Sequence, residues 1–206
     1  MARLYNSATL IATWNKVARD IILKNPDHIA VIDCPCRSTK EKPCEPLDVC
    51  MAVGEPFVGF LLEHKTNNAR KLSQEEAVAI LQAEDDRGHI HSAWFKDAMG
   101  DRFYAICNCC KCCCGAMRAH AFGIPMLAAS GYVCEIREDC TGCGDCVDFC
   151  QFGAISMDGV GVAQVAYERC MGCGVCESKC PAGAITLALD PAKGAPLDLK
   201  ALVEPV

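Results

Sequence analysis

Cysteine thiols provide the most distinctive chemistry of this chain. An 18-residue segment that begins at Cys140, CTGCGDCVDFCQFGAISM, recurs 30 residues later from Cys170 as CMGCGVCESKCPAGAITL. The two copies are identical at nine of 18 positions, which include all four cysteines, both glycines of the GCG core and the Gly-Ala-Ile that follows. Each copy therefore presents four potential thiolate ligands in the pattern C-x2-C-x2-C-x3-C.

This spacing is the one that holds cubane [4Fe–4S] clusters, and the fourth cysteine of each copy serves the other cluster. Glycines beside the cysteines let the backbone approach a ligand closely. Zinc is the alternative, but zinc sites usually come as paired C-x2-C knuckles and not as triplets followed by a fourth cysteine. We therefore expect two [4Fe–4S] clusters with these ligand sets: Cys140, Cys143, Cys146 and Cys180 for one, and Cys170, Cys173, Cys176 and Cys150 for the other.

Over about residues 131–190 the chain resembles the bacterial two-cluster 2[4Fe–4S] ferredoxins, a segment of about 60 of 206 residues. The resemblance implies a pseudo-twofold β-α-β fold with a low-potential cluster at each end. The second copy ends in Cys180-Pro181 as that family does, whereas Cys150 is followed by Gln151. We expect this difference to change the rigidity and the potential near one cluster without removing a ligand.

A second group of cysteines lies in the first 130 residues. Four occur in C-x-C-x7-C-x5-C spacing from Cys34, and six more occupy eight positions in residues 107–114. Prolines stiffen the first loop, and Arg37 and Lys40 could neutralise an anionic cluster. Buried free thiols are the alternative, but four in 17 residues exceed what packing needs. The additional metal ligands that we expect are Cys34, Cys36, Cys44, Cys50, Cys107, Cys109, Cys110, Cys112, Cys113 and Cys114.

Eleven cysteines lie outside the repeat, enough for two sets of four. We expect one further cluster that draws on both N-terminal groups, and the count leaves room for a fourth. Cys134 is expected to be a core thiol, and His89-x-His91 is not expected to bind metal. Residues 30–115 resemble the uncharacterised N-terminal domain of larger anaerobe iron–sulfur proteins that join a C-x-C-R and an I-C-N-C-C segment to a ferredoxin module. That resemblance implies cluster binding without naming a reaction.

Periodicity predicts the elements that must position these thiols. Residues 8–24 predict an amphipathic helix, residues 28–32 a strand that delivers Cys34, and residues 73–87 a helix with a Ser73-x-x-Glu76 capping box. Residues 89–95 and 102–106 predict two strands that lead into the 107–114 run, and residues 115–122 predict a helix. A helix followed by a hairpin forms a small α/β unit of winged-helix proportions, although it lacks the basic helix that DNA binding would need.

The predicted fold class is α+β, with a small Cys-rich N-terminal α/β domain followed by a ferredoxin-like pseudo-twofold domain. The expected limits are residues 1–130, 131–190 and a C-terminal tail, 191–206, which could wrap back onto the N-terminal unit, grip a partner or be disordered. No run of 18 apolar residues predicts a membrane span, and the N-terminus lacks the pattern of a signal peptide. With 19 cysteines to keep reduced, we expect the cytoplasm of an anaerobe.

Charge points to a protein partner. The net charge is −6, and residues 131–206 hold 5 basic and 11 acidic side chains. Such an acidic face suits docking to a basic patch on a redox partner, although ordinary solubility explains it equally well, and no basic stripe predicts nucleic-acid binding.

The leading hypothesis is an electron carrier, or a subunit of a larger oxidoreductase complex, that relays single electrons to a partner oxidoreductase. The first alternative is a redox enzyme with an unusual or open-site cluster at residues 107–114, and the second is an N-terminal docking module stabilised by zinc.

Overall fold

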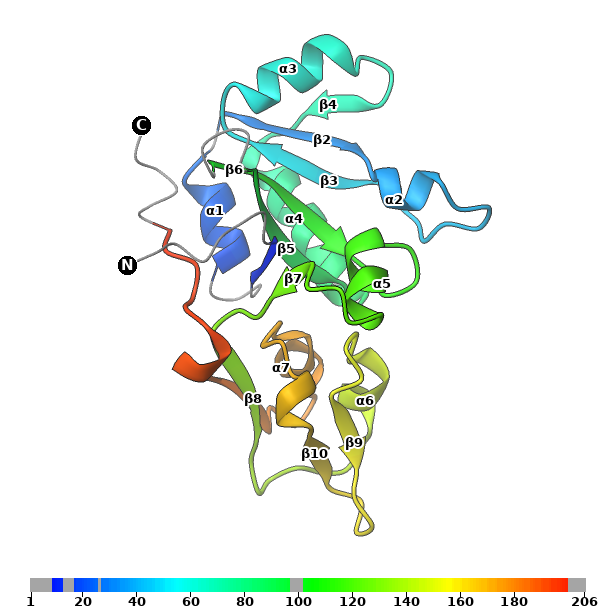
Figure 1. Cartoon of the computed structure of the whole chain (residues 1–206), viewed down its shortest axis with the longest axis vertical. Helices are drawn as coiled ribbons and strands as arrows, with labels where there is room; N and C mark the ends of the chain where they lie inside the picture. Colours follow the sequence, from blue (N-terminus) through cyan, green and yellow to red (C-terminus); the bar gives the residue numbers. More distant parts are fainter. Residues whose placement is uncertain (1–8, 13–16, 26, 97–101, 200–206) are drawn as a thin grey trace.

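A seven-stranded sheet forms the N-terminal half of this computed structural model, which describes residues 9–12, 17–25, 27–96 and 102–199 (Figure 1). The strand order is β4-β2-β3-β6-β5-β1-β7, and all neighbours are antiparallel except β1 and β7. The strands are β1 (Thr9–Ala12), β2 (Ile29–Asp33), β3 (Asp48–Val53), β4 (Ala69–Lys71), β5 (Ile90–Lys96), β6 (Arg102–Cys109) and β7 (Leu127–Ala128). The helices are α1 (Arg19–Leu23), α2 (Pro35–Ser38), α3 (Phe57–His64), α4 (Gln74–Asp86) and α5 (Gly115–Ala121).

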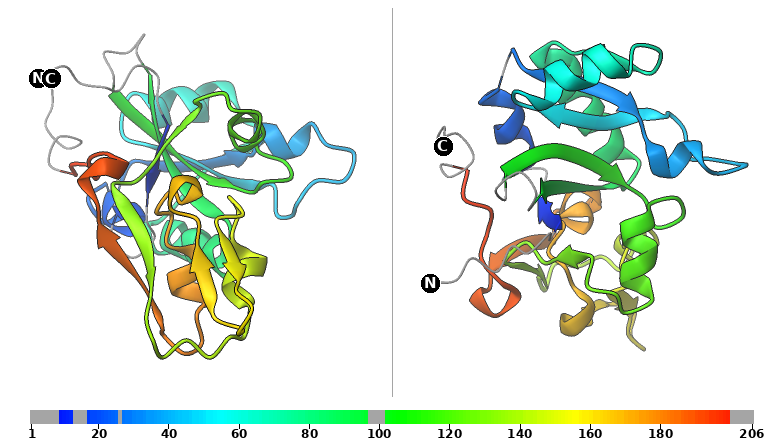
Figure 2. Two further views of the ribbon diagram at one scale, coloured as in Figure 1. Left: turned by 60° about the horizontal axis from the view of Figure 1, so that its bottom comes forward. Right: turned by 45° about the horizontal axis from the view of Figure 1, so that its top comes forward.

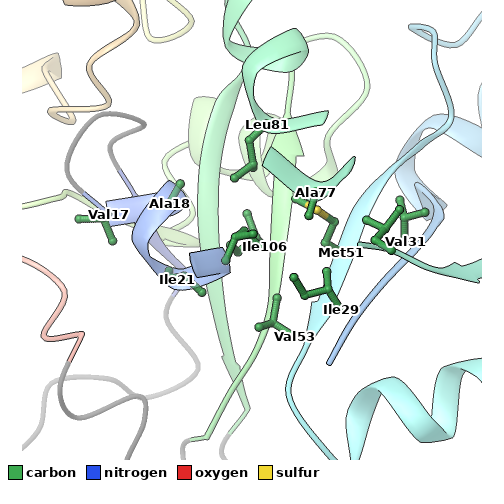
Figure 3. Close-up of a cluster of buried hydrophobic side chains, with 12 residues drawn as sticks. Val17, Ala18, Ile21, Ile29, Val31, Met51, Val53, Ala77, Leu81 and Ile106 are labelled. Carbon is green, nitrogen blue, oxygen red and sulfur yellow. The ribbon is translucent and has the colours of Figure 1, made fainter. Parts of the chain in front are cut away.

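Helices cover both faces of this sheet. Alternate residues of β2 point to opposite faces, so Ile29 and Val31 join a core under α1 and α4, whereas Ala30 packs under α3. Figure 3 shows the larger core, in which Ile21 of α1 and Leu81 of α4 meet the strand residues. Each such fully buried aliphatic side chain stabilises the fold by roughly 1.5–3 kcal/mol.

The predicted helix with a capping box is confirmed as α4. The Ser73 hydroxyl accepts a hydrogen bond from the Glu76 backbone N–H at 3.1 Å, and the Glu76 carboxylate accepts one from the Ser73 N–H at 2.8 Å. Gly88 follows the helix with φ of 75°, a conformation that glycine adopts without strain. The predicted strands before Cys34 and Cys107 and the helix after Cys114 are present as well.

Two predictions for the N-terminal half are wrong. Residues 9–12 form strand β1 instead of the start of a helix, because the free edge of β5 pairs with this segment. The helix in this region spans only Arg19–Leu23, while residues 13–16 lie outside the described residues. The β5–β6 hairpin is not half of a winged-helix unit, because β3 also pairs with β6 and extends the sheet.

The C-terminal half contains the cysteine repeat. Both copies run in the same order of strand, cysteine loop, helix and strand, as β8-α6-β9 and β10-α7-β11 (Figures 1 and 2). The copies exchange partners, since β8 pairs with β11 and β9 with β10, both antiparallel. The elements are β8 (Tyr132–Ile136), α6 (Asp145–Phe149), β9 (Ile155–Met157), β10 (Ala163–Val165), η3 (Tyr167–Arg169), α7 (Val175–Lys179), β11 (Ile185–Leu189) and η4 (Pro191–Lys193). The chain is thus a mixed α/β protein with small sheets in this half.

The tail returns to the N-terminal half, which is one of the three arrangements that the sequence left open. Leu197 and Leu199 pack against the core under α1, while Leu202 and Val203 lie outside the described residues. No helix within the described ranges has the length and apolar character to span a bilayer. The expected domain limits remain predictions.

Candidate metal centres

The first copy of the repeat forms a pocket that is lined by thiols from both copies. Its lining includes the three loop cysteines of the first copy together with Cys180 of the second copy. Met157, Ala163 and Ile185 close the pocket with apolar groups. The set that we expected for one cluster, Cys140, Cys143, Cys146 and Cys180, is therefore brought together.

The second copy forms the equivalent pocket, with Cys150 crossing over from the first copy. Cys170, Cys173, Cys176 and Cys150 line it together. The two pockets are similar in their lining, with four of the expected ligand thiols and neighbouring apolar groups in each. Matching backbone donors lie beside the crossing cysteines: the Ala154 N–H donates to the Cys150 sulfur and the Ala184 N–H to the Cys180 sulfur, both at 3.2 Å. Hydrogen bonds to ligand sulfurs are among the features that set the reduction potential of a bound cluster.

Cys134 adds a further thiol to the second pocket. It is buried and lines that pocket, and its backbone N–H donates to the Cys170 sulfur at 3.5 Å. A hydrogen bond with the Cys134 thiol and burial raise the pKa of Cys176. The burial of Cys134 agrees with the prediction that it is a core thiol.

The Cys146 thiol holds its proton before metal binds. Burial, followed by the charges of neighbouring thiols, raises the pKa of Cys146 to about 11. A cluster must therefore displace protons when it binds, so acid weakens its retention and a higher pH favours it.

Seven of the ten N-terminal cysteines line a third pocket, which we call the six-thiol pocket after the six thiols that are hydrogen-bonded to one another in series. It lies where α2 begins, β6 ends and α5 begins, and Trp94, Tyr104 and Arg37 complete its wall. Neighbouring thiols form a continuous series of side-chain hydrogen bonds around it, from Cys107 to Cys50, Cys34, Cys36, Cys114 and Cys109. This series brings together cysteines from both N-terminal groups, as the sequence led us to expect.

The other four N-terminal cysteines form a separate cluster, which we call the four-thiol group. The sulfurs of Cys44, Cys110, Cys112 and Cys113 all lie within 4.8 Å of one another. Strand β6 ends at Cys109, and the chain turns over residues 111–113 instead of continuing as a strand. Cys110 also borders the six-thiol pocket, so it lies between the two sets.

Arg37 holds the C-x-C segment against the sheet. Its guanidinium is buried and donates to the Glu84 carboxylate and to the backbone carbonyls of Pro46 and Asn108. Burial alone would raise the pKa of Glu84, but hydrogen bonds from His89 and Arg37 outweigh it and lower that pKa. Glu84 therefore supplies the charge that balances Arg37.

The predicted role of Arg37 beside an anionic cluster is compatible with its position. Arg37 lines the six-thiol pocket, and its buried Nε has no hydrogen-bond partner among the described residues. Hydrogen bonds with Cys114 and then Cys34 lower the pKa of the Cys36 thiol, and the charge of Lys40 contributes less.

Both histidines of His89-x-His91 have protein partners. His89 Nδ1 lies 2.7 Å from a Glu84 carboxylate oxygen, and His91 Nδ1 lies 2.6 Å from the Asn108 side-chain oxygen. These contacts tie the start of β5 to α4 and β6.

Both copies of the repeat contact the N-terminal half, the first through Gln151 and the second through α7. The Gln151 side chain accepts from the Lys111 N–H at 3.0 Å and donates to the Gly88 carbonyl at 2.8 Å. Lys179 of α7 lies 3.7 Å from Asp85 of α4. One apolar cluster spans the contact and includes cysteines from the six-thiol pocket and from the second copy; we call it the connecting cluster. Its members are Ile90, Cys109, Cys114, Ala116, Met117, Leu127, Met171 and Val175, with Trp94, Cys107, Met126, Ala129, Phe149, Phe152 and Cys173 packed around them.

A family model described as a 4Fe-4S dicluster domain matches residues 139–184, which contain all eight cysteines of the repeat. No curated protein matches the chain. The matched segment and the clustered thiols identify an iron–sulfur protein that binds at least one Fe–S cluster, and they support a role in electron transfer.

Proposed function

We propose that this protein is an electron carrier, or an electron-transfer subunit, with two [4Fe–4S] clusters in the repeat and a third cluster in the six-thiol pocket. The observation that carries the proposal is the succession of three thiol-lined pockets, the second and third of which are joined by the connecting cluster. It would work in a reducing cytoplasm, as in an anaerobe, because 19 thiols must be kept from oxidation.

The residues of each pocket suit an iron–sulfur cluster. Four thiols converge in each repeat pocket, and glycines in the left-handed region, such as Gly142 and Gly172, let the backbone approach closely. A Cβ on Gly142 would lie 2.3 Å from the Gly161 carbonyl, and one on Gly172 would lie 2.2 Å from the Tyr132 carbonyl. When bound in such pockets, these clusters exchange single electrons at potentials of roughly −700 to +450 mV.

The second-copy pocket occupies the middle position between the other two. Cys173 belongs to that pocket and Cys109 and Cys114 to the six-thiol pocket, and all three pack in the connecting cluster. Met171 and Val175 fill the space between them and are buried. This packing excludes water from the path and fixes the separation of the two sets of thiols.

Two accessible surfaces near the repeat pockets carry opposite charge. Glu138, Asp139 and Asp148 are exposed near the first-copy pocket. A groove lined by Lys111, Arg118, His120 and Arg169 instead leads to Cys150 of the second pocket, with Glu168 as its one acidic lining residue. We infer that a partner with a basic patch docks at the first copy, and that its association slows as salt screens the charges.

Metal analysis and redox titration of the anaerobically purified chain test the proposal. Iron and acid-labile sulfide should each reach about eight per chain from the repeat and about four more from a third cubane, and low-temperature EPR should show signals that titrate with one electron each. A colourless protein that lacks labile sulfide would contradict it.

The six-thiol pocket also favours a second candidate, a redox enzyme. A single cubane uses four thiolates, whereas seven cysteines line this pocket. A larger or site-differentiated cluster would leave iron available to a substrate. An EPR signal that changes with substrate, and that Cys→Ala changes in residues 107–114 abolish while the repeat signals persist, would favour this enzyme over the carrier.

A further inference from the structure

We propose that the four-thiol group binds a single Zn²⁺ ion in a tetrahedral site that is separate from every iron–sulfur cluster. The group consists of Cys44, Cys110, Cys112 and Cys113. This inference does not depend on electron transfer, because it concerns four thiols that lie outside the two repeat pockets.

The distances between the sulfurs fit one ion. With Zn–S bonds of about 2.3 Å, four sulfurs at the corners of a tetrahedron lie about 3.8 Å apart. The Cys112 and Cys113 sulfurs are 3.8 Å apart, those of Cys44 and Cys112 are 3.0 Å apart, and no pair exceeds 4.8 Å. A cubane would need wider spacing, because each of its thiolates binds a different iron at a different corner. The group is too compact for a cluster.

Backbone N–H groups point at the sulfurs of the four-thiol group. The Cys44 N–H points to the Cys113 sulfur at 3.5 Å, and the Cys113 N–H donates to the Cys110 sulfur. Such donors reduce the cost of gathering several negative sulfurs around one ion. The adjacent Cys114 contributes to the six-thiol pocket instead, where its thiol forms hydrogen bonds with those of Cys36 and Cys109. The turn after β6 therefore divides the cysteine run between two centres.

A closed set of four thiolate ligands favours zinc. Tetrahedral S4 sites hold zinc or iron, and closed sites of four protein ligands are typical of structural zinc. Cys44 and Cys112 are 68 residues apart, so the ion would link the loop after α2 to the turn after β6. That turn contains Lys111, whose N–H donates to Gln151 of the repeat. Zinc would thus hold the surface on which the repeat packs.

Metal content and zinc X-ray absorption of the full, anaerobically purified chain test this site. We expect one zinc per chain in addition to the cluster iron, with a first shell of four sulfurs at about 2.3 Å. The double variant C44S/C112S should lose at least nine-tenths of the zinc and keep its iron and labile sulfide. This variant spares the buried Cys110 and Cys113. K111A, which changes an exposed side chain between two ligands and keeps every thiol, should retain the zinc.

Three results would overturn the assignment. One is wild-type protein without zinc, and another is a zinc shell that contains nitrogen or oxygen. The third is a loss of iron together with sulfide in C44S/C112S, which would make these thiols cluster ligands. If the double variant fails to fold, the wild-type absorption spectrum still decides. Loss of the repeat clusters would contradict the proposed function and leave this site untouched, so the two failures are distinguishable.

Discussion

The two copies of the cysteine repeat place the same ligands in different surroundings. In the first copy, Thr141 and Cys143 are exposed, and Met157 of β9 and Ala163 of β10 line the pocket. In the second copy, the equivalent Met171 is buried and Cys173 is partly covered. The same ligand spacing thus occurs in one more exposed and one more buried loop. The sequence of the repeat determines the ligand geometry, whereas the segments that pack on each copy determine its exposure.

The N-terminal half causes this difference through a few contacts. Phe149 fits against Gly88, Gln151 bridges Lys111 and Gly88, and Met171 fills the connecting cluster. Reduction adds negative charge, which a buried site solvates poorly. We therefore expect the second-copy cluster to have the lower reduction potential of the two.

The largest expected effect comes from the crossed ligands. C150S should remove or convert the cluster of the enclosed second copy, with a loss of up to about four iron atoms, because its fourth thiolate comes from the first copy. C180S should do the same to the exposed first copy. EPR and iron analysis of both variants separate the two clusters. Damage to the first-copy cluster in C150S would show that the ligands do not cross.

A substitution at Gly88 should disturb the contact between the halves. Gly88 has φ of 75°, and a Cβ there would lie 2.4 Å from the Phe149 ring. We expect G88A to lower the free energy of unfolding by about 3 kcal/mol through strain and overpacking. G123A is the matched control, since Gly123 has φ of 79° with nothing within 4 Å of its Cβ, and it should cost about 1 kcal/mol. Denaturant midpoints by circular dichroism measure both; equal losses would mean that Phe149 does not press on Gly88.

Gln151 should control how well the second copy is covered. Q151P introduces after Cys150 the proline that follows Cys180. It also removes two hydrogen bonds between Gln151 and the N-terminal half. The substitution should lower the free energy of unfolding by about 1–2 kcal/mol. It should also raise the reduction potential of the second-copy cluster toward that of the first-copy cluster. P181Q alters the equivalent, exposed position of the other copy and should change little. An EPR-monitored redox titration checks both, and an unchanged second-copy potential in Q151P would count against the role of the contact.

The smallest expected effect concerns the order in which the two repeat clusters are lost. An iron chelator should remove the first-copy cluster before the second-copy cluster, because only the first-copy loop exposes a ligand cysteine to solvent. EPR signals followed over time give the two rates. Loss of the second-copy signal first would reverse the comparison.

Sequence patterns were most informative where ligands are close along the chain. The spacing of the repeat predicted which eight cysteines gather in two pockets, and the capping box of α4 was predictable because it involves neighbouring residues. The strand at residues 9–12 was mistaken for a helix, because its pairing partner is about 80 residues away. The ion pair between Arg37 and Glu84 could not be predicted from the sequence, since the two residues lie 47 positions apart.

The amino-acid sequence by itself determined the chemistry of this protein, because ligands two or three residues apart are placed by the local backbone whatever surrounds them. Only the tertiary structure divided the ten N-terminal cysteines into a six-thiol pocket and a four-thiol group. Adjacent residues such as Cys113 and Cys114 serve different centres, and their partners approach from distant segments. Burial of the second copy has the same origin, since it arises from contacts between the two halves of the chain and not from the repeat.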